Sequence, residues 1–229
     1  TGGELYEAVV RRGHFTERKA ALILRDTISA LKALHDCDIL HLDIKPENIL
    51  FESNHADSIV KITDFGLSKI FSEGVHNQTK NCPSVEELNA RAEAFINCGN
   101  FNADHVRGTF GYMSPELILC GYYSTASDVF ASGVILYILL CGYPPFNSKS
   151  IRQLFLRTVK GAYKLSGPEW DRISPEAKDL IKKMLDTNPR TRISTEAVLV
   201  HPWIVKAVEA HDKENATAAA TAAAAAAAA

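Results

Sequence analysis

The sequence lacks a strong excess of either charge, because its 229 residues hold 25 lysines and arginines against 27 acids, a formal net charge of −2. Surfaces that bind nucleic acid are usually distinctly basic, so no nucleic-acid partner is expected. The sequence has no run of about eighteen apolar residues of the transmembrane type except the terminal alanines, which are too weakly hydrophobic to indicate a membrane span. The sequence also shows no secretory signal. We therefore expect neither a membrane partner nor secretion.

Cysteine is scarce and irregularly placed. The count is odd and no two cysteines show C-x-x-C spacing, which argues against a disulfide framework or a zinc motif. Reduced thiols are typical of the cytoplasm and the nucleus, so a cytoplasmic or nuclear location is expected. The five cysteines are Cys37, Cys82, Cys98, Cys120 and Cys141.

The chain does contain enough apolar residues for one large core, since 46% of its residues are hydrophobic and 23% are charged. Thr16 is a suitable N-cap for a helix with one apolar face, and the nearly all-apolar run near 127–141 predicts a buried central helix. The expected fold class is mainly α with short β-strands. Helices are expected over 20–36, 127–141, 151–159, 175–185 and 195–205, and short strands over 38–40, 49–51 and 59–62.

The densest group of chemically active residues is His-Leu-Asp-Ile-Lys-Pro-Glu-Asn at 41–48, followed after a strand-like run by Asp-Phe-Gly at 64–66. Each stretch alone could be a polar turn, because Asp, Gly and Pro all favour turns. Together they supply a carboxylate, a cation and an amide, with a second carboxylate further on. Phosphoryl transfer needs this set, since it depends on positioning, charge neutralisation and oxygen ligands for Mg²⁺.

Further motifs follow in a fixed order: Gly-Thr-Phe-Gly-Tyr at 108–112, Ser-Pro-Glu at 114–116, Asp-Val-Phe-Ala-Ser-Gly at 128–133, Cys-Gly-Tyr-Pro-Pro-Phe at 141–146 and Asn-Pro-Arg-Thr-Arg-Ile at 188–193. With these motifs the chain resembles the C-terminal lobe of a protein serine/threonine kinase, most closely the calcium/calmodulin-dependent group. The resemblance runs from the Gly-Gly-Glu-Leu at 2–5 to the His-Pro-Trp-Ile at 201–204. It implies the large lobe of the kinase fold over 1–206.

The resemblance implies a role for each catalytic residue. Asp43 is expected to orient the substrate hydroxyl and accept its proton, and Lys45 to meet the transferring phosphate. Asn48 and Asp64 are expected to hold Mg²⁺, with ATP as the phosphate donor. The remaining nucleotide-side residues are Glu4 near the ribose, Glu47 beside the catalytic loop, and Leu50 as the floor for adenine.

The resemblance also implies residues that support the site. His41 is expected to pack under Phe65 of the motif that Gly66 completes, Thr109 to contact Asp43 and Lys45, and Asp128 to accept backbone N–H groups of the catalytic loop. Glu116 and Arg192 are expected to form an ion pair. For these charges a solvated surface position is the alternative.

Leu42 departs from the usual pattern, in which an arginine precedes the catalytic aspartate and pairs with a phosphate on the activation segment. Leucine cannot make that pair, so activity is not expected to be gated there. A second departure is extra length in this segment, around 74–106, with a capping box at 84–87 that predicts a short helix. This insertion is either a regulatory or docking element or a tolerated surface loop.

Substrate preference follows from two acids. Glu4 and Glu47 occupy positions that in similar kinases meet arginines upstream of the phosphorylated residue, so protein substrates with a basic residue about three before the Ser or Thr are expected. The low-complexity segment 207–229 is expected to be disordered or a frayed helix. Because it is neither basic nor amphipathic, calmodulin binding is not supported.

Neither a glycine-rich phosphate loop nor a strand lysine of the kinase type occurs in the sequence, and the resemblance starts just past the hinge between the lobes. The expectation is a kinase fragment that is inactive alone. Two alternatives are a stand-alone lobe that acts as a binding or scaffold module and a pseudokinase, which the intact Asp43, Lys45, Asn48 and Asp64 argue against.

Overall fold

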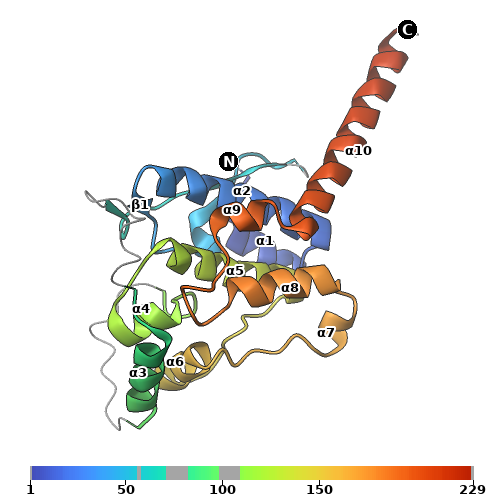
Figure 1. Ribbon diagram of the computed structural model, residues 1–229. Helices are drawn as coiled ribbons and strands as arrows, with labels where there is room; N and C mark the ends of the chain where they lie inside the picture. Colours follow the sequence, from blue (N-terminus) through green and yellow to red (C-terminus); the bar gives the residue numbers. More distant parts are fainter. Residues whose placement is uncertain (1, 56–57, 71–81, 98–108, 228–229) are drawn as a thin grey trace.

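The computed structural model describes residues 2–55, 58–70, 82–97 and 109–227, and it is mainly helical with a few short strands (Figure 1). This confirms the expected fold class. The helices are α1 (Leu5–Arg12), α2 (Glu17–Asp36), α3 (Val85–Asn97), α4 (Pro115–Cys120), α5 (Thr125–Cys141), α6 (Ile151–Val159), α7 (Pro168–Asp171), α8 (Pro175–Met184), α9 (Thr195–Leu199) and α10 (Pro202–Ala227), with a 3-10 turn η1 (Pro46–Asn48).

Four short strands form two antiparallel pairs within the described chain. Strand β2 (Ile49–Phe51) pairs with β3 (Val60–Ile62), with Leu50 opposite Lys61. Strand β1 (Ile39–Leu40) pairs with β4 (Lys69–Ile70). The first three strands were predicted. Strand β4 was not, because two residues give no periodic signal and only their partner in β1 makes them a strand.

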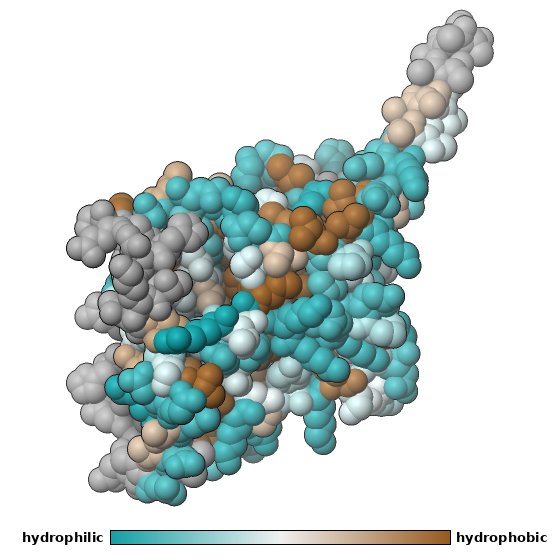
Figure 2. Space-filling model, in the orientation of Figure 1, coloured by the Kyte–Doolittle hydropathy of each residue, from teal (hydrophilic) through white to brown (hydrophobic). Residues whose placement is uncertain are grey.

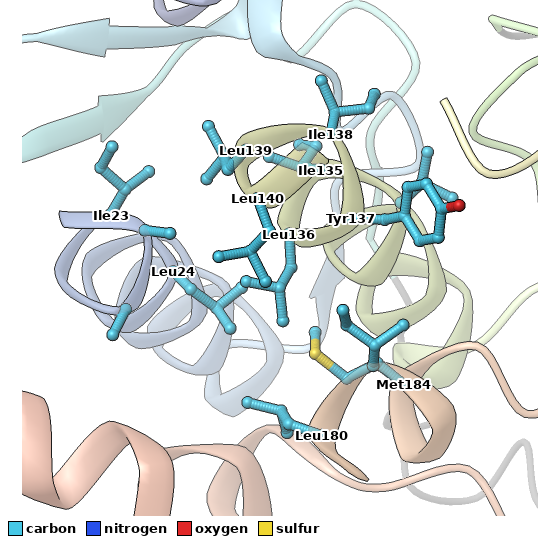
Figure 3. Close-up of a cluster of buried hydrophobic side chains, with 14 of the residues drawn as sticks. Ile23, Leu24, Ile135, Leu136, Tyr137, Ile138, Leu139, Leu140, Leu180 and Met184 are labelled. Carbon is cyan, nitrogen blue, oxygen red and sulfur yellow. The ribbon is translucent and has the colours of Figure 1, made fainter. Parts of the chain in front are cut away.

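Helix α5 forms the centre of the core. It is apolar on nearly every side and buried from Ser127 to Cys141, as its sequence predicted. Figure 3 shows how Ile23 and Leu24 of α2 and Leu180 and Met184 of α8 surround it. Each large aliphatic side chain that is fully buried here stabilises the fold by roughly 1.5–3 kcal/mol relative to the same side chain exposed to water.

Two glycines let other elements approach α5 closely. A Cβ on Gly133 would lie 2.8 Å from the Cβ of Met184 in α8. Gly142 ends α5 with a φ of +88°, and a Cβ there would lie 2.4 Å from the carbonyl oxygen of Gly13. Both positions therefore require glycine for packing, and at Gly142 the positive φ adds a second reason.

The start of α2 connects three elements. Thr16 caps the helix by accepting the N–H of Lys19, as predicted. The carboxylate of Glu17 accepts the N–H and hydroxyl of Ser174, the N-cap of α8, at 2.8 and 2.6 Å. It also accepts the indole N–H of Trp203 in α10 at 2.7 Å. One carboxylate thus fixes α8 and α10 against α2.

The single helix predicted over 195–205 was wrong. The structure has two, α9 and α10, separated at Val200 and His201. Pro202 explains the break, because proline lacks the N–H that a continuing helix needs but suits the first turn of a new one.

Helix α10 continues through the low-complexity segment and projects from the body, beyond a small hydrophobic patch at its base (Figures 1 and 2). Its first half remains attached, since Arg18 of α2 pairs with Glu214 and contacts His211. Packing therefore crosses the boundary expected at 206. None of the described helices is both long and apolar enough to span a bilayer.

Candidate active site

The stretch 41–48 forms a loop between β1 and β2, with η1 as its last turn. The loop is tied to the end of β3, because the N–H and the hydroxyl of Thr63 both donate to the carbonyl of Asn48, at 2.9 and 3.2 Å. The strands on both sides thus fix the two ends of the loop. Such fixing favours catalysis that depends on positioned side chains.

Asp128, in the first turn of α5, fixes the start of the loop through hydrogen bonds. It is 1% exposed and accepts the backbone N–H groups of His41 and Leu42 at 3.0 and 2.8 Å, as predicted. His35 of α2 bonds the same carboxylate at 2.9 Å, a contact that the sequence did not indicate. Leu42 has a φ of +64°, a backbone conformation that is costly for leucine. The hydrogen bond from the Leu42 N–H to Asp128 helps to hold this conformation.

Asp43, Lys45, Thr109 and Asn48 meet in one hydrogen-bonded cluster, called here the Asp43 cluster. The Nζ of Lys45 lies 2.6 Å from Oδ2 of Asp43 and 3.1 Å from the hydroxyl of Thr109. That hydroxyl donates to Oδ1 of Asp43 at 3.0 Å. Asn48 donates to the carbonyl and Oδ2 of Asp43 at 2.9 and 3.2 Å. The predicted contacts of Thr109 are confirmed.

The cluster sets the charge of Asp43, which is 8% exposed. Burial alone disfavours the ionised carboxylate. Hydrogen bonds from Lys45 and Thr109, with the charge of Lys45, outweigh burial and lower the pKa of Asp43. The side chain is therefore a fixed carboxylate at neutral pH, suited to orienting a hydroxyl group.

His41 has a supporting position. Its Nδ1 accepts the N–H of Asp43 at 3.3 Å, so the proton is on Nε2, which lies 3.1 Å from the carbonyl of Thr63. Both ring nitrogens are therefore used in hydrogen bonds within the protein. The ring packs against Phe65 with centroids 5.2 Å apart, as predicted.

Asp64 and Asn48 are the predicted metal ligands. Asp64 is exposed, has a φ of +63°, and uses Oδ1 to accept the N–H of Gly66 at 3.1 Å. Asn48 donates through its Nδ2 to Asp43, which leaves its Oδ1 as an acceptor. One amide and one carboxylate oxygen fit Mg²⁺, which keeps waters and phosphate oxygens as further ligands. Among described residues no cluster of three or more His, Cys, Asp or Glu side chains is arranged for a metal.

Two of the residues predicted for the nucleotide side, Glu4 and Leu50, lie next to each other. Glu4 pairs with Leu50 in an isolated β-bridge, which brings the start of α1 to β2. Glu47 has a buried Oε2 without a hydrogen-bond partner among the described residues. Burial, and then the charge of Glu47, raise the pKa of Tyr112. Tyr112 ends the Gly-Thr-Phe-Gly-Tyr stretch, but the sequence assigned this residue no role in the site.

Glu116 of α4 and Arg192 form the predicted ion pair. It is bidentate, with Nη1–Oε1 and Nη2–Oε2 distances of 2.7 and 2.9 Å, and both side chains are 0% exposed. Arg192 also donates to the carbonyls of Asp186 and Ala126 at 2.8 Å each. The solvated alternative is therefore wrong for this pair.

A pocket of about 530 Å³ lies beside this site. Its described lining comes from Leu42, from Gly66 to Lys69, and from α4 with Tyr123. Asp43, Lys45 and Asn48 are not part of that lining. The large pocket is thus separate from the Asp43 cluster.

Comparison with known proteins gives a consistent result. The family described as protein kinase domain matches residues 1–204. Calcium-dependent protein kinase 12 of Arabidopsis thaliana is 40% identical over 93% of this chain and 38% of its own length. Calcium/calmodulin-dependent protein kinase type 1 of Caenorhabditis briggsae is 38% identical over 89% of this chain and 50% of its own length. Calcium-dependent protein kinase SK5 of Glycine max is 39% identical over 93% of this chain and 36% of its own length.

The chain thus spans half or less of the length of these three relatives. The family match includes the stretches 41–48 and 64–66, which suggested phosphoryl transfer, and both residues of the buried Glu116–Arg192 ion pair. This chain belongs to the protein kinase family.

Proposed function

We propose that this chain is the C-terminal lobe of a protein serine/threonine kinase and that the Asp43 cluster is its catalytic centre. The observation that supports this most strongly is the arrangement of Asp43, Lys45, Thr109 and Asn48 within direct hydrogen-bond distance of one another. A carboxylate with a lowered pKa, a neighbouring ammonium group and a nearby amide oxygen are the groups that phosphoryl transfer needs.

Each residue has one role in this proposal. Asp43 accepts a hydrogen bond from the substrate hydroxyl and orients it. It takes the hydroxyl proton as the substrate oxygen bonds to the γ-phosphorus of ATP and the bond from that phosphorus to ADP breaks, with ADP as the leaving group. Lys45 holds the carboxylate and neutralises negative charge beside it. Asn48 and Asp64 would hold Mg²⁺. When bound, Mg-ATP supplies the phosphoryl group and the metal charge that stabilises it.

ATP is proposed to lie against Leu50, with Glu4 near the ribose. The β-bridge between Glu4 and Leu50 supports this placement, because it brings both residues together beside strand β2.

A cytoplasmic or nuclear location is also proposed. Reduced thiols fit it, and the described cysteines, Cys37, Cys82, Cys120 and Cys141, are free. Calmodulin control is not proposed, since 207–229 is not basic.

Protein substrates with a basic residue about three positions before the acceptor are proposed. The place of Glu47 supports this, because its partly exposed carboxylate lies in η1, one residue from Asn48 of the Asp43 cluster, and a carboxylate there can pair with a substrate guanidinium. The active form for this and the later kinetic tests is a polypeptide that joins 1–229 to the glycine-rich loop and strand lysine that this sequence lacks. With this active form, we expect a peptide library with a fixed central serine to show selection for Arg or Lys at that position. Substituting Glu47→Gln should reduce the selection about tenfold, since it removes one charge-assisted bond.

The matched control is Glu52→Gln, which removes an exposed acid paired with Lys61 on the surface. It should leave the selection unchanged. A preference for acidic residues or proline in the wild-type screen, or equal selection by the Glu47→Gln variant, would contradict the proposed substrate class.

Residues 1–229 by themselves are proposed to lack measurable kinase activity. Kinases hold the phosphates with a glycine-rich loop and a strand lysine, and this sequence contains neither motif. Calorimetry with purified 1–229 should show very weak Mg-ATP binding, and a radiolabel assay should show no transfer to peptide. Robust turnover by this polypeptide would overturn the proposal.

A further inference from the structure

The helix α3 within the extra segment is built to present one apolar face. It begins with a capping box, in which Ser84 accepts the N–H of Glu87 at 3.1 Å and donates its own N–H to that side chain at 2.7 Å. Leu88, Ala92 and Phe95 follow at helical spacing and are at least partly buried. Four charged residues of this segment, Glu86, Glu87, Arg91 and Glu93, are exposed, and of these Glu86 and Glu93 lie opposite the apolar face by their helical spacing.

This apolar face is not left open to solvent. Ala92 and Phe95 pack against a second hydrophobic cluster, separate from the main core, that is centred on Met113, Ile118, Phe155 and Val159. Figure 1 shows α3 beside α4 and α6, the helices that supply most of this cluster. An unconstrained surface loop would not need a capped helix with its face buried in this way.

The same cluster includes the residues that follow Thr109. Phe110 packs on it, with its ring 5.6 Å from that of Phe155 in an edge contact. Met113 is 4% exposed within it. Since Thr109 bonds both Asp43 and Lys45, the stretch 110–113 links the cluster directly to the proposed catalytic centre.

A polar contact fixes the approach to α3. The guanidinium of Arg190 donates to the carbonyl of Cys82, just before the helix. Two residues further on, Arg192 forms the buried pair with Glu116 of α4. One short loop after α8 therefore anchors both the entrance to α3 and the helix against which α3 packs.

From these contacts we propose that α3 is a permanent brace for residues 109–113, and that Phe95 is a positioning residue for the peptide substrate. A hydroxyl presented to Asp43 must pass beside this stretch, so its order determines how well a peptide is held. The role in substrate binding rests on the proposed function. The bracing itself does not.

The bracing is tested first by hydrogen exchange in the 229-residue chain. The reporter is the amide of Tyr112, which donates to the carbonyl of Thr109 at 3.0 Å. Phe95→Ala should speed its exchange about tenfold while amides in α5 keep their protection. Phe95→Leu should restore the slow rate. Glu93→Ala, on the exposed face of the same helix, should match the wild type.

The positioning role is tested in the form of the protein that transfers phosphate. Phe95→Ala should raise the KM for peptide about tenfold and leave kcat and the KM for ATP within about twofold. If Phe95→Ala unfolds the chain, Ser84→Ala decides, because it removes the cap without touching the cluster. Unchanged Tyr112 exchange overturns the brace, and an unchanged peptide KM overturns the positioning role. If the polypeptide that also carries the glycine-rich loop and the strand lysine transfers no phosphate while exchange in the 229-residue chain is accelerated, the proposed function is rejected and the brace still stands.

Discussion

Replacing Asp43 by asparagine is expected to lower the turnover of the active kinase about a thousandfold, since a positioned carboxylate that accepts a proton contributes roughly 10²–10⁴ in rate. Asparagine keeps the size of the side chain but loses the charge that Lys45 and Thr109 surround. Steady-state kinetics with a serine peptide measure the effect. The Kd for Mg-ATP should change little, because the predicted metal ligands Asn48 and Asp64 remain.

The control is Asp36→Asn, which alters an exposed carboxylate paired with Lys32 on the surface of α2. Its turnover should stay within about twofold of wild type. The lowered pKa of Asp43 adds a pH test, because an aspartate whose pKa lies below its ordinary value of about 3.9 stays ionised above that pH. No loss of turnover between pH 8 and 6 should therefore arise from Asp43. An Asp43→Asn variant with near wild-type turnover would remove this residue from the mechanism.

Removing the guanidinium of Arg192 is expected to destabilise the fold by about 3–5 kcal/mol, because Arg192→Ala leaves the carboxylate of Glu116 buried without its partner. The variant also loses the bonds to the Asp186 and Ala126 carbonyls and the contact over the ring of Phe130. Urea unfolding followed by circular dichroism measures the change. A loss of this size is a large part of the stability of a typical domain.

Two further variants test whether burial of the ion pair causes this loss of stability. Lys183→Ala breaks the exposed pair with Asp179 in α8, and it should cost no more than about 0.5 kcal/mol. A double variant, Glu116→Gln with Arg192→Gln, leaves no unpaired charge, so its cost should be smaller than the sum of the two single costs. If Arg192→Ala and Lys183→Ala destabilise equally, the buried pair has no special role.

The sequence predicted the elements whose signal is local. Helix α2 follows from the Thr16 cap and one apolar stripe, and α5 from its apolar residues on all sides. Helix α4 was missed although Pro115 and Gly121 stand at its two ends, a signal that proline and glycine rules can detect. The break before Pro202 was missed in the same way.

The parts of the site that could not be predicted depend on distant contacts. His35 reaches Asp128 from a position 93 residues away, and nothing in the spacing of α2 indicates that partner. The positive φ angles of Leu42 and Asp64 fall on non-glycine residues, which sequence rules assign to other conformations. The contacts of Thr109 and Glu116 were anticipated only through the family resemblance.

The most direct test of the account measures phosphate on matched peptides. Three peptides, identical except for Ser, Thr or Tyr at the acceptor position, are incubated with Mg-ATP and the active form of the protein, either wild type or Asp43→Asn, and are then analysed by mass spectrometry. We predict phosphate on the Ser and Thr peptides with the wild type and about a thousandfold less with the variant. Phosphate on the Tyr peptide alone, or equal transfer by both proteins, would contradict it.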